Sequence, residues 1–339
     1  MTAPLTVLES FPAPRPTSVN PYTLLLADSI REAGATLVYF SWRNALTARY
    51  DLFHVHWPEI LVEGRTPARR LARQALTLLL VARLALLRRP IVRTVHNLGL
   101  PEGLSLVQRG ILRLIDRKTV LRVRLNEHTP VAGPVATIPH AHFRSWFSRY
   151  PQSTPVAGQV GYVGRIRRYK GVESLLEAFR GTRVLAGGAP APALSARIVG
   201  YASTPELQNA LMELAGTDER ITIEFGFVSD ATIADVVTSS ELLVLPYRVM
   251  HNSSAAITGL SLDRPILVPD NEVTRDLAAE VGPGWVHTFE GELSSESLLA
   301  ALEAVRTHPP VTRPRLDARE WVDSGRAHVE AFRTAVARA

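Results

Sequence analysis

The chain has 339 residues, a length that normally divides into two domains, and it contains no cysteine. Disulfides, thiolate metal sites and cysteine nucleophiles are therefore excluded, and the composition fits a reducing compartment without requiring one. Charge is uneven, because residues 1–150 hold 20 Lys and Arg against 9 Asp and Glu (net +11), whereas residues 151–339 hold 18 against 23 (net −5).

Strand-like and helix-like segments alternate along the first half. Strands are expected at Thr6–Glu9, Thr36–Phe40, Leu52–His56, Ile91–His96, Val120–Asn126 and Ala136–Pro139. Helices are expected at Pro21–Ala33, Arg65–Arg88 and Leu104–Asp116. Strands separated by helices give a parallel sheet with right-handed crossovers, so residues 1–150 are predicted to form a Rossmann-like α/β domain.

The second half repeats this alternation and predicts a second Rossmann-like domain over residues 159–318. Its strands are expected at Val160–Val163, Ala196–Val199, Ile221–Phe225, Leu242–Leu245 and Ile266–Pro269. Its helices are expected at Val172–Phe179, Pro205–Ala215, Ala231–Ser239, Ala255–Leu262, Thr274–Glu280 and Ser294–Arg306. The Pro-, Gly- and Ser-rich segment Pro151–Gly158 is the predicted boundary, and Arg319–Arg338 is a predicted final helix.

Two strand ends in the second half carry the residues of a diphosphate site. The first strand ends at Gly164 and presents Arg165 and Lys170 just before a helix. The second leads through Asn252, Ser253 and Ser254 into another helix. Cations neutralise phosphate oxygens, and free N–H groups at helix starts complete the shell. Alternatively, Arg165 and Lys170 are surface cations and Asn252 or Ser253 simply caps its helix.

Four ordered segments together resemble the nucleotide-sugar glycosyltransferases of the GT-B fold: HVHWPE and TVHN in the first half, and GRIRRYKG and LPYRVMHNSSAAITGLSLDRPILVPDN in the second. The resemblance implies two Rossmann-like domains whose parallel sheets face each other across a cleft, with helix 319–339 crossing back to the first domain. Within this class the chain is most similar to bacterial mannosyltransferases that use GDP-mannose.

The resemblance also suggests roles for individual residues. It places His96 near the donor sugar, although a histidine at a strand end can be purely structural. Glu59, expected in a loop after the HVH strand, is either a general base for the acceptor hydroxyl or a solvated acid. His54 and His56 alternate in that strand, but with no third ligand nearby we expect no metal site.

Further candidates lie at other strand ends. Asn20, Tyr22 and Trp57 are expected on the acceptor side, with helix capping as the alternative for Asn20. The nucleoside is expected to contact Tyr201, Phe227, Val228 and Glu272. Many retaining members of the superfamily carry Glu-x7-Glu, where this chain has Met250 and Thr258. The stereochemical outcome is therefore open.

The predicted activity is transfer of mannose from GDP-mannose to a saccharide or lipid-linked saccharide. The alternatives are a UDP-sugar donor, a GT-B phosphorylase or epimerase, and a non-catalytic protein that binds sugar nucleotides. No Asp-x-Asp motif is present, so we expect no obligatory metal and no cofactor. No nucleic-acid recognition module is visible, so nucleic acid is not an expected partner.

The location is expected to be cytoplasmic, since MTAPLTVLES lacks the pattern of a signal peptide. Arginines flank the Leu-rich segment between Arg69 and Arg89. This segment is either an interfacial helix that draws the enzyme to anionic lipid, or an ordinary helix packed on the sheet with its arginines in solvent.

Overall fold

The computed structural model describes residues 5–14, 20–100, 103–185 and 194–339. They form two compact units, one of residues 1–141 with 318–339 and the other of residues 142–317. Each unit contains a six-stranded parallel sheet. Both units have the α/β architecture that the sequence predicts.

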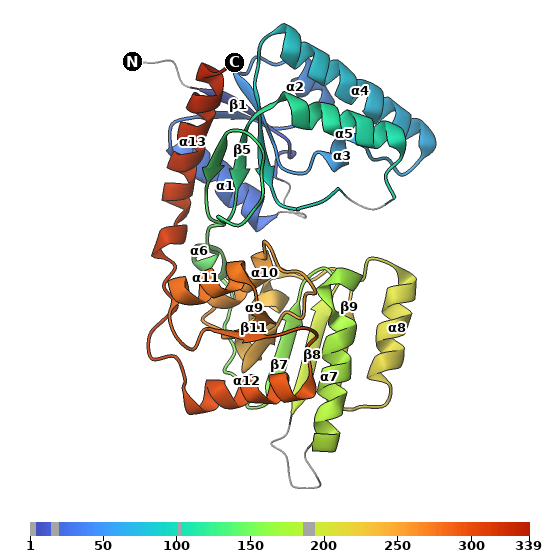
Figure 1. Cartoon of the computed structure of the whole chain (residues 1–339), viewed down its shortest axis with the longest axis vertical. Coiled ribbons are helices and arrows are strands. Elements are labelled where there is room, and N and C mark those ends of the chain that lie inside the picture. Colours follow the sequence, from blue (N-terminus) through green and yellow to red (C-terminus); the bar gives the residue numbers. More distant parts are fainter. Residues whose placement is uncertain (1–4, 15–19, 101–102, 186–193) are drawn as a thin grey trace. The chain divides into compact units, whose positions relative to one another are not determined.

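The first sheet has the strand order β2-β1-β3-β4-β5-β6. Its strands are β1 (Thr6–Glu9), β2 (Thr36–Val38), β3 (Leu52–Val55), β4 (Ile91–Val95), β5 (Thr119–Arg124) and β6 (Val135–Thr137). Figure 1 shows α1 (Pro21–Glu32) and α13 (Trp321–Ala337) on one face. The other face carries α2 (Trp42–Thr47), α3 (Glu59–Val62), α4 (Pro67–Leu86) and α5 (Leu106–Lys118). Because helices cover both faces, β3 is buried along its whole length.

Helix α13 joins the first unit although it ends the chain. It packs against α1, where Gly325 lies so close to the backbone of Ser29 that an added Cβ would stand 2.2 Å from the Ser29 carbonyl oxygen. The guanidinium of Arg319 donates to the His140 carbonyl at 3.2 Å. Phe332 of α13 is fully buried, with its ring 4.9 Å from that of His54.

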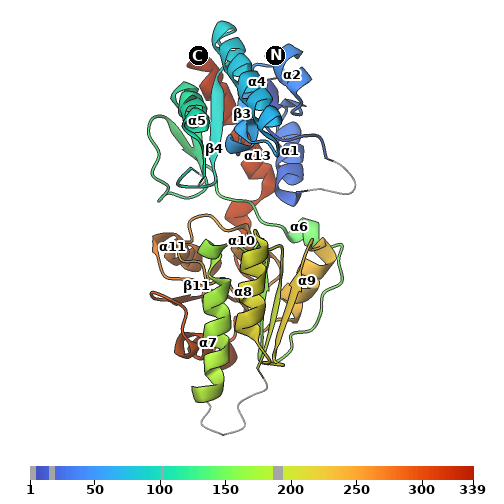
Figure 2. The same ribbon diagram turned by 90° about the vertical axis from the view of Figure 1, so that its right-hand side faces the viewer.

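The second sheet has the order β12-β11-β10-β7-β8-β9. Its strands are β7 (Gln159–Val163), β8 (Ser195–Gly200), β9 (Ile221–Phe225), β10 (Leu242–Val244), β11 (Ile266–Pro269) and β12 (Val286–Phe289). Its helices are α6 (Arg144–Phe147), α7 (Val172–Leu185), α8 (Pro205–Ala215), α9 (Asp230–Ser239), α10 (Ser254–Ser261), α11 (Glu272–Val281) and α12 (Ser295–Thr307). Figure 2 shows α7 beside α8, while α9 packs against β7 and β8.

The boundary between the units lies at Ala141 and His142, earlier than the predicted Pro151–Gly158 segment. Hydrogen bonds explain the shift. The amide of Phe143 donates to Ser261 Oγ at 2.9 Å, and the Tyr150 hydroxyl donates to Asp230 at 3.3 Å. Residues 142–150, expected in the first domain, therefore belong to the second unit. Strand β12 and the short helices α2, α3 and α6 are additions to the predicted elements.

Candidate active site

The loop after β7 is shaped by two glycines with positive φ. Gly164 has φ +131°, and Gly171, which precedes α7, has φ +64°. A Cβ at Gly171 would stand 2.0 Å from the carbonyl oxygen of Pro246, so only glycine allows this loop to pack on the segment after β10. The Ile166 amide also donates to the Tyr201 carbonyl at 2.9 Å, which ties the loop to the end of β8.

Arg165 and Lys170 are the two of this loop's four cations that the sequence assigns to the diphosphate. The Nζ of Lys170 lies 4.8 Å from the Tyr247 ring centroid, and the Arg248 amide donates to the Tyr169 carbonyl at 3.0 Å. Arg165 is exposed. Among the described residues no carboxylate pairs with Arg165 or Lys170, whereas Arg168 lies 3.8 Å from Glu173. Within the described part of the chain, these two cations therefore make no ion pair with a carboxylate.

The start of α10 follows the same segment. Ser253 caps the helix by accepting from the Ala256 amide at 3.2 Å, so capping falls to Ser253 and not to Asn252. Asn252 is partly exposed, and Ser254, the first helical residue, is exposed. The first turn contains no acidic residue, so nothing on the helix itself offsets the positive end of its dipole. Met250 and Thr258 are buried.

The candidate nucleoside residues separate into two places. Tyr201 and Phe227 follow the neighbouring strands β8 and β9, and their side chains are 58% and 87% exposed. Val228 is partly exposed beside Phe227. Glu272 begins α11 after β11, which lies three strand positions from β8, about 14 Å at the usual spacing. The structure therefore places Tyr201 and Phe227 after neighbouring strands and Glu272 after a strand three positions away.

In the first unit, His96 follows β4 and lies in an aromatic cluster. Its ring stacks on Trp57, with centroids 4.5 Å apart and planes at 17°, and the Tyr22 ring meets it edge-on at 5.4 Å. Its Nε2 lies 3.0 Å from Nδ1 of His56. Burial is the main cause that lowers the pKa of His56 to about 4 and that of His96 well below its ordinary value. Both rings are therefore neutral at pH 7.

Tyr22 lies inside this cluster, although it was expected to face the acceptor. Asn20 caps α1 by accepting from the Tyr22 amide at 3.1 Å. The Tyr22 ring also meets His140 at 4.9 Å and Trp321 at 5.8 Å, which leaves the residue 7% exposed. Burial raises the pKa of its hydroxyl. Tyr22 thus supports the surrounding rings and presents little surface to a substrate.

Glu59 was expected in a loop but is the first residue of α3. This single helical turn buries Leu61 and Val62 against the core, which explains why the chain coils directly after Pro58. Glu59 is partly exposed.

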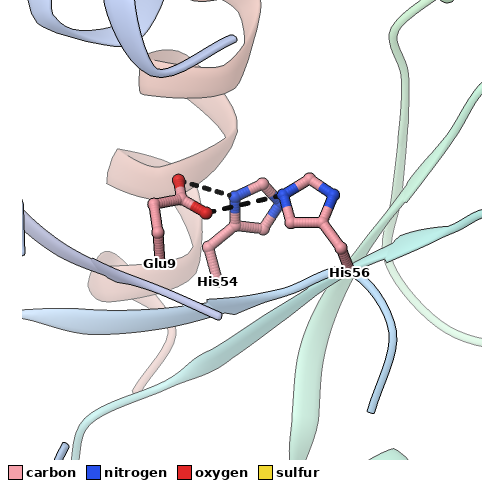
Figure 3. A group of neighbouring side chains, drawn as sticks. All are labelled: Glu9, His54 and His56. Atoms are coloured by element: carbon pink, nitrogen blue, oxygen red, sulfur yellow. Dashed lines mark hydrogen bonds and ion pairs between the residues drawn. The ribbon is translucent and has the colours of Figure 1, made fainter. Parts of the chain in front are cut away.

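Glu9 is a buried acid that the sequence did not single out. It ends β1 directly beside His54 of β3 and is fully buried. Its Oε1 accepts from His54 Nδ1 at 3.0 Å, and its Oε2 lies 3.5 Å from His56 Nε2 (Figure 3). Burial opposes ionisation, but the charge of His54, its hydrogen bond to Oε1 and the nearby His56 ring hold the pKa of Glu9 at about 2. In the sequence, the feature that could have revealed Glu9 is an acidic residue at the end of a largely apolar predicted strand.

Glu9 also supplies the third potential metal ligand that seemed to be lacking beside His54 and His56. The ligand atoms of the three lie within 4.8 Å of one another. Three ring nitrogens are nevertheless engaged in hydrogen bonds: His54 Nδ1 with Glu9, His54 Nε2 with Thr94 Oγ1 at 2.8 Å, and His56 Nδ1 with His96. A metal would need bare nitrogens and bonds of about 2.0–2.2 Å. The group fits a hydrogen-bonded network better than a metal centre.

Known proteins resemble the chain over nearly its whole length. A GDP-mannose:glycolipid 4-β-D-mannosyltransferase of Xanthomonas campestris pv. campestris is 40% identical over 329 residues, which is 97% of this chain and 92% of that protein. No family model matches the chain.

Solved structures with similar folds have much lower sequence identity. HepE of Anabaena, in complex with UDP-glucose, superposes with TM-score 0.60 at 14% identity, covering 98% of this chain and 96% of that one. Sucrose-phosphate synthase of Thermosynechococcus elongatus superposes with TM-score 0.58 at 15% identity, covering 98% and 95%.

Proposed function

Because the chain belongs to the family of the Xanthomonas GDP-mannose:glycolipid mannosyltransferases, a group of GT-B glycosyltransferases, we propose that it transfers mannose from GDP-mannose to a hydroxyl group of a glycolipid. The second unit would bind the nucleotide sugar and the first would bind the acceptor.

The observation that carries this proposal is the pair of cations Arg165 and Lys170. Both lie after β7 without a carboxylate partner among the described residues, and the segment packed beside them leads to the start of α10. When the bond between C1 of the sugar and the diphosphate breaks, negative charge grows on the leaving oxygen. Stabilising that charge is the largest electrostatic contribution a protein can make to this step. Arg supplies a two-pronged donor and Lys a compact charge, so we expect no resident metal.

The relatives' name specifies a β-D-mannosyl product, whereas the mannose of the common donor GDP-mannose is α-linked to the diphosphate. Transfer from such a donor to such a product inverts C1 and requires direct attack by the acceptor hydroxyl, whose proton must be removed. Non-acidic Met250 and Thr258 at the Glu-x7-Glu positions agree with this proposal. We assign the proton acceptor to His96, whose ring is held on several sides, in preference to Glu59.

Exposed leucines on α4 support contact with the membrane that carries a glycolipid acceptor. The helix packs on the core through Leu80, Val81 and Leu84, yet Leu71 and Leu86 are 69% and 83% exposed. Exposed Leu78 and Leu79 share this face, and Leu106 and Val107 of the adjacent α5 are also exposed.

Basic residues border this apolar face. Arg69, Arg70 and Arg88 are exposed, while Arg83 and Arg89 are held by the Ala48 carbonyl and by Asp51. Apolar side chains flanked by arginines suit the interface of an anionic bilayer. No helix within the described ranges is both long and apolar enough to span a membrane. We propose peripheral contact at the cytoplasmic face.

Purified protein tests the donor assignment in two assays. A thermal-shift panel should show stabilisation by GDP and GDP-mannose, since a ligand at 100 times its Kd adds about 2.7 kcal/mol, and little by UDP, ADP or their sugar conjugates. A transfer assay should then yield a β-mannosylated glycolipid, with and without a chelator. Preference for a UDP-sugar, turnover of free sugar phosphate, or activity that a chelator abolishes would contradict the proposal.

A further inference from the structure

A cavity of about 300 Å³ lies in the first unit at the amino ends of β4 and β5. Its apolar lining includes the buried Leu84 of α4 and Ile91 of β4, and the partly exposed Val120 of β5. The five residues of β4 rise about 16 Å between this cavity and the segment that carries His96. The cavity is therefore separate from the aromatic cluster, and its size suits a small ligand.

Four basic residues line the same cavity: Arg88, Arg89, Lys118 and Arg338. None of its described lining residues has an acidic side chain. Arg89 pairs with Asp51 at 3.1 Å. The other three are exposed, and they make no ion pair within the ranges that the structure describes. We call this place the basic cavity, and its three unpaired cations are available to a ligand.

The carboxyl ends of three helices also lie at the basic cavity, since α4 ends at Leu86, α5 at Lys118 and α13 at Ala337. Cations are favourable at such ends, each of which carries about −0.5 of an elementary charge. Three ends therefore offset about 1.5 of the three positive charges. The remaining positive charge is more than the helices need, so the basic cavity suits an anion.

Arg88 has a backbone conformation that is unusual for an arginine, with φ +50°. Its amide donates to the Ala85 carbonyl at 3.2 Å, and the Arg89 amide donates to the Leu84 carbonyl at 2.8 Å. These are the two bonds of a Schellman motif, in which glycine normally occupies the position of Arg88 because a Cβ is strained there. The chain therefore places a guanidinium at the basic cavity where the backbone alone would favour glycine.

The surroundings of the basic cavity favour a phosphate that carries alkyl chains. Leu86 and Leu87, which lie between Ala85 and Arg88 of the lining, are 83% and 47% exposed. Cations bind phosphate oxygens by charge-assisted hydrogen bonds, and exposed leucines beside them suit the start of an acyl chain. A free phosphate would leave this apolar surface in water.

We propose that the basic cavity binds the phosphate head group of one anionic lipid. Arg88, Lys118 and Arg338 contact the phosphate oxygens, and the acyl chains lie beside Leu86 and Leu87. The inference rests on the membrane contact of the proposed function. It adds a defined head-group site to the general attraction between arginines and an anionic bilayer, at a distance from the residues assigned to mannose transfer.

Titration calorimetry with soluble short-chain lipids tests the ligand class. Dihexanoyl phosphatidylglycerol should bind. Dihexanoyl phosphatidylcholine, whose choline cancels the phosphate charge, and glycerol 3-phosphate, which lacks acyl chains, should each bind at least about tenfold more weakly. Glycerol 3-phosphate that binds as tightly as the anionic lipid would reveal a site for free phosphates and would overturn the lipid assignment.

Arg88→Gly is the most informative variant, because it should weaken binding without loss of stability. Losing one charge-assisted hydrogen bond should raise the Kd for dihexanoyl phosphatidylglycerol at least about tenfold. Glycine relieves the strain of the positive φ, so the urea midpoint should stay or rise. Arg338→Gln should raise the Kd similarly. The control is Arg333→Gln, at an exposed arginine of α13 outside the lining, which should bind as the wild type does.

The outcomes separate this inference from the proposed function. Unchanged lipid binding in both Arg88→Gly and Arg338→Gln would overturn the site. A wild-type protein that sediments with anionic vesicles but does not bind the short-chain lipid would retain the membrane contact and refute the head-group site. Binding of the short-chain lipid by a protein that does not use GDP-mannose would support the site and refute the donor assignment.

Discussion

Lys170 places its ammonium 4.8 Å from the centroid of the Tyr247 ring, which joins the cationic loop after β7 to the segment that leads from β10 to α10. Gly171 and Pro246 make the same connection through the backbone. Two loops that are about seventy residues apart in the sequence thereby meet at the carboxyl ends of the neighbouring strands β7 and β10. The face of the Tyr247 ring is an electron-rich surface beside a cation that has no carboxylate partner among the described residues.

Arg165→Ala and Lys170→Ala should each reduce turnover about a hundredfold, because losing a contact to a charged leaving group costs on the order of 3 kcal/mol in the transition state. Steady-state kinetics with GDP-mannose measures this loss. Unfolding free energies should change by no more than about 0.5 kcal/mol, as is usual for surface residues. Arg168→Ala is the matched control, since this neighbour pairs with Glu173 and should keep near-normal rates. Normal kinetics in both variants would refute the diphosphate site.

Two helical glycines should respond oppositely to alanine. At Gly325 a Cβ would stand 2.2 Å from the Ser29 carbonyl oxygen, so Gly325→Ala must separate α13 from α1 and should cost about 1–3 kcal/mol. At Gly110 of α5 nothing lies within 4 Å, so Gly110→Ala should stabilise the helix by about 0.5–1 kcal/mol. Urea denaturation measures both changes. If both substitutions change the free energy of unfolding equally, the close approach of α13 to α1 does not make a side chain at position 325 costly.

Lowering the pH below neutrality should decrease the free energy of unfolding. Burial lowers the pKa of His56 and His140 to about 4 and that of His328 to about 3, so the unfolded chain binds more protons than the folded one as pH falls through 6.5. Stability must then decrease on acidification. Glu9 adds to this loss as pH falls from 4.5 toward its folded pKa of about 2.

Substituting His328 measures the share of one buried histidine in this loss of stability at low pH. Its Nδ1 donates to the Ser324 carbonyl at 2.7 Å, and its buried Nε2 has no hydrogen-bond partner among the described residues, so protonation would place an unsatisfied charge in the core. Denaturation at pH 7.5 and pH 5.0 should show a smaller decrease for His328→Gln than for the wild type. His308→Gln, at an exposed histidine, should show the full decrease. Equal stability of the wild type at the two pH values would contradict this account.

Membrane contact predicts that substituting Arg69, Arg70 and Arg88 together by Gln weakens binding to anionic vesicles on the order of a hundredfold, at about 1 kcal/mol per arginine. Added salt should weaken wild-type binding in the same direction. Vesicle sedimentation measures both effects. The control replaces Arg168, Arg326 and Arg333, which are exposed elsewhere. Loss of binding in the control, or no binding by the wild type, would refute the assigned face.

The residue pattern alone determined the fold class, since apolar strands alternating with helices permit few other arrangements. Most predicted elements agree with the structure to within a few residues, and Pro205–Ala215 and Ile221–Phe225 agree exactly in their bounds. The sequence also marked the cationic loop, because glycines, cations and a helix start lie within one short segment. Family membership followed in the same way, as ordered motifs along one chain.

Only the tertiary structure decided which distant residues meet. Glu9 lies 45 positions before His54 in the sequence but directly opposite it in the sheet, because β1 pairs with β3 and not with β2 alone. Strand order likewise separates Glu272 from Tyr201, and ring packing buries Tyr22. Local propensity contains no information on strand order or on the packing of side chains from distant segments, so these relationships arise only when the sheet and its helices are assembled.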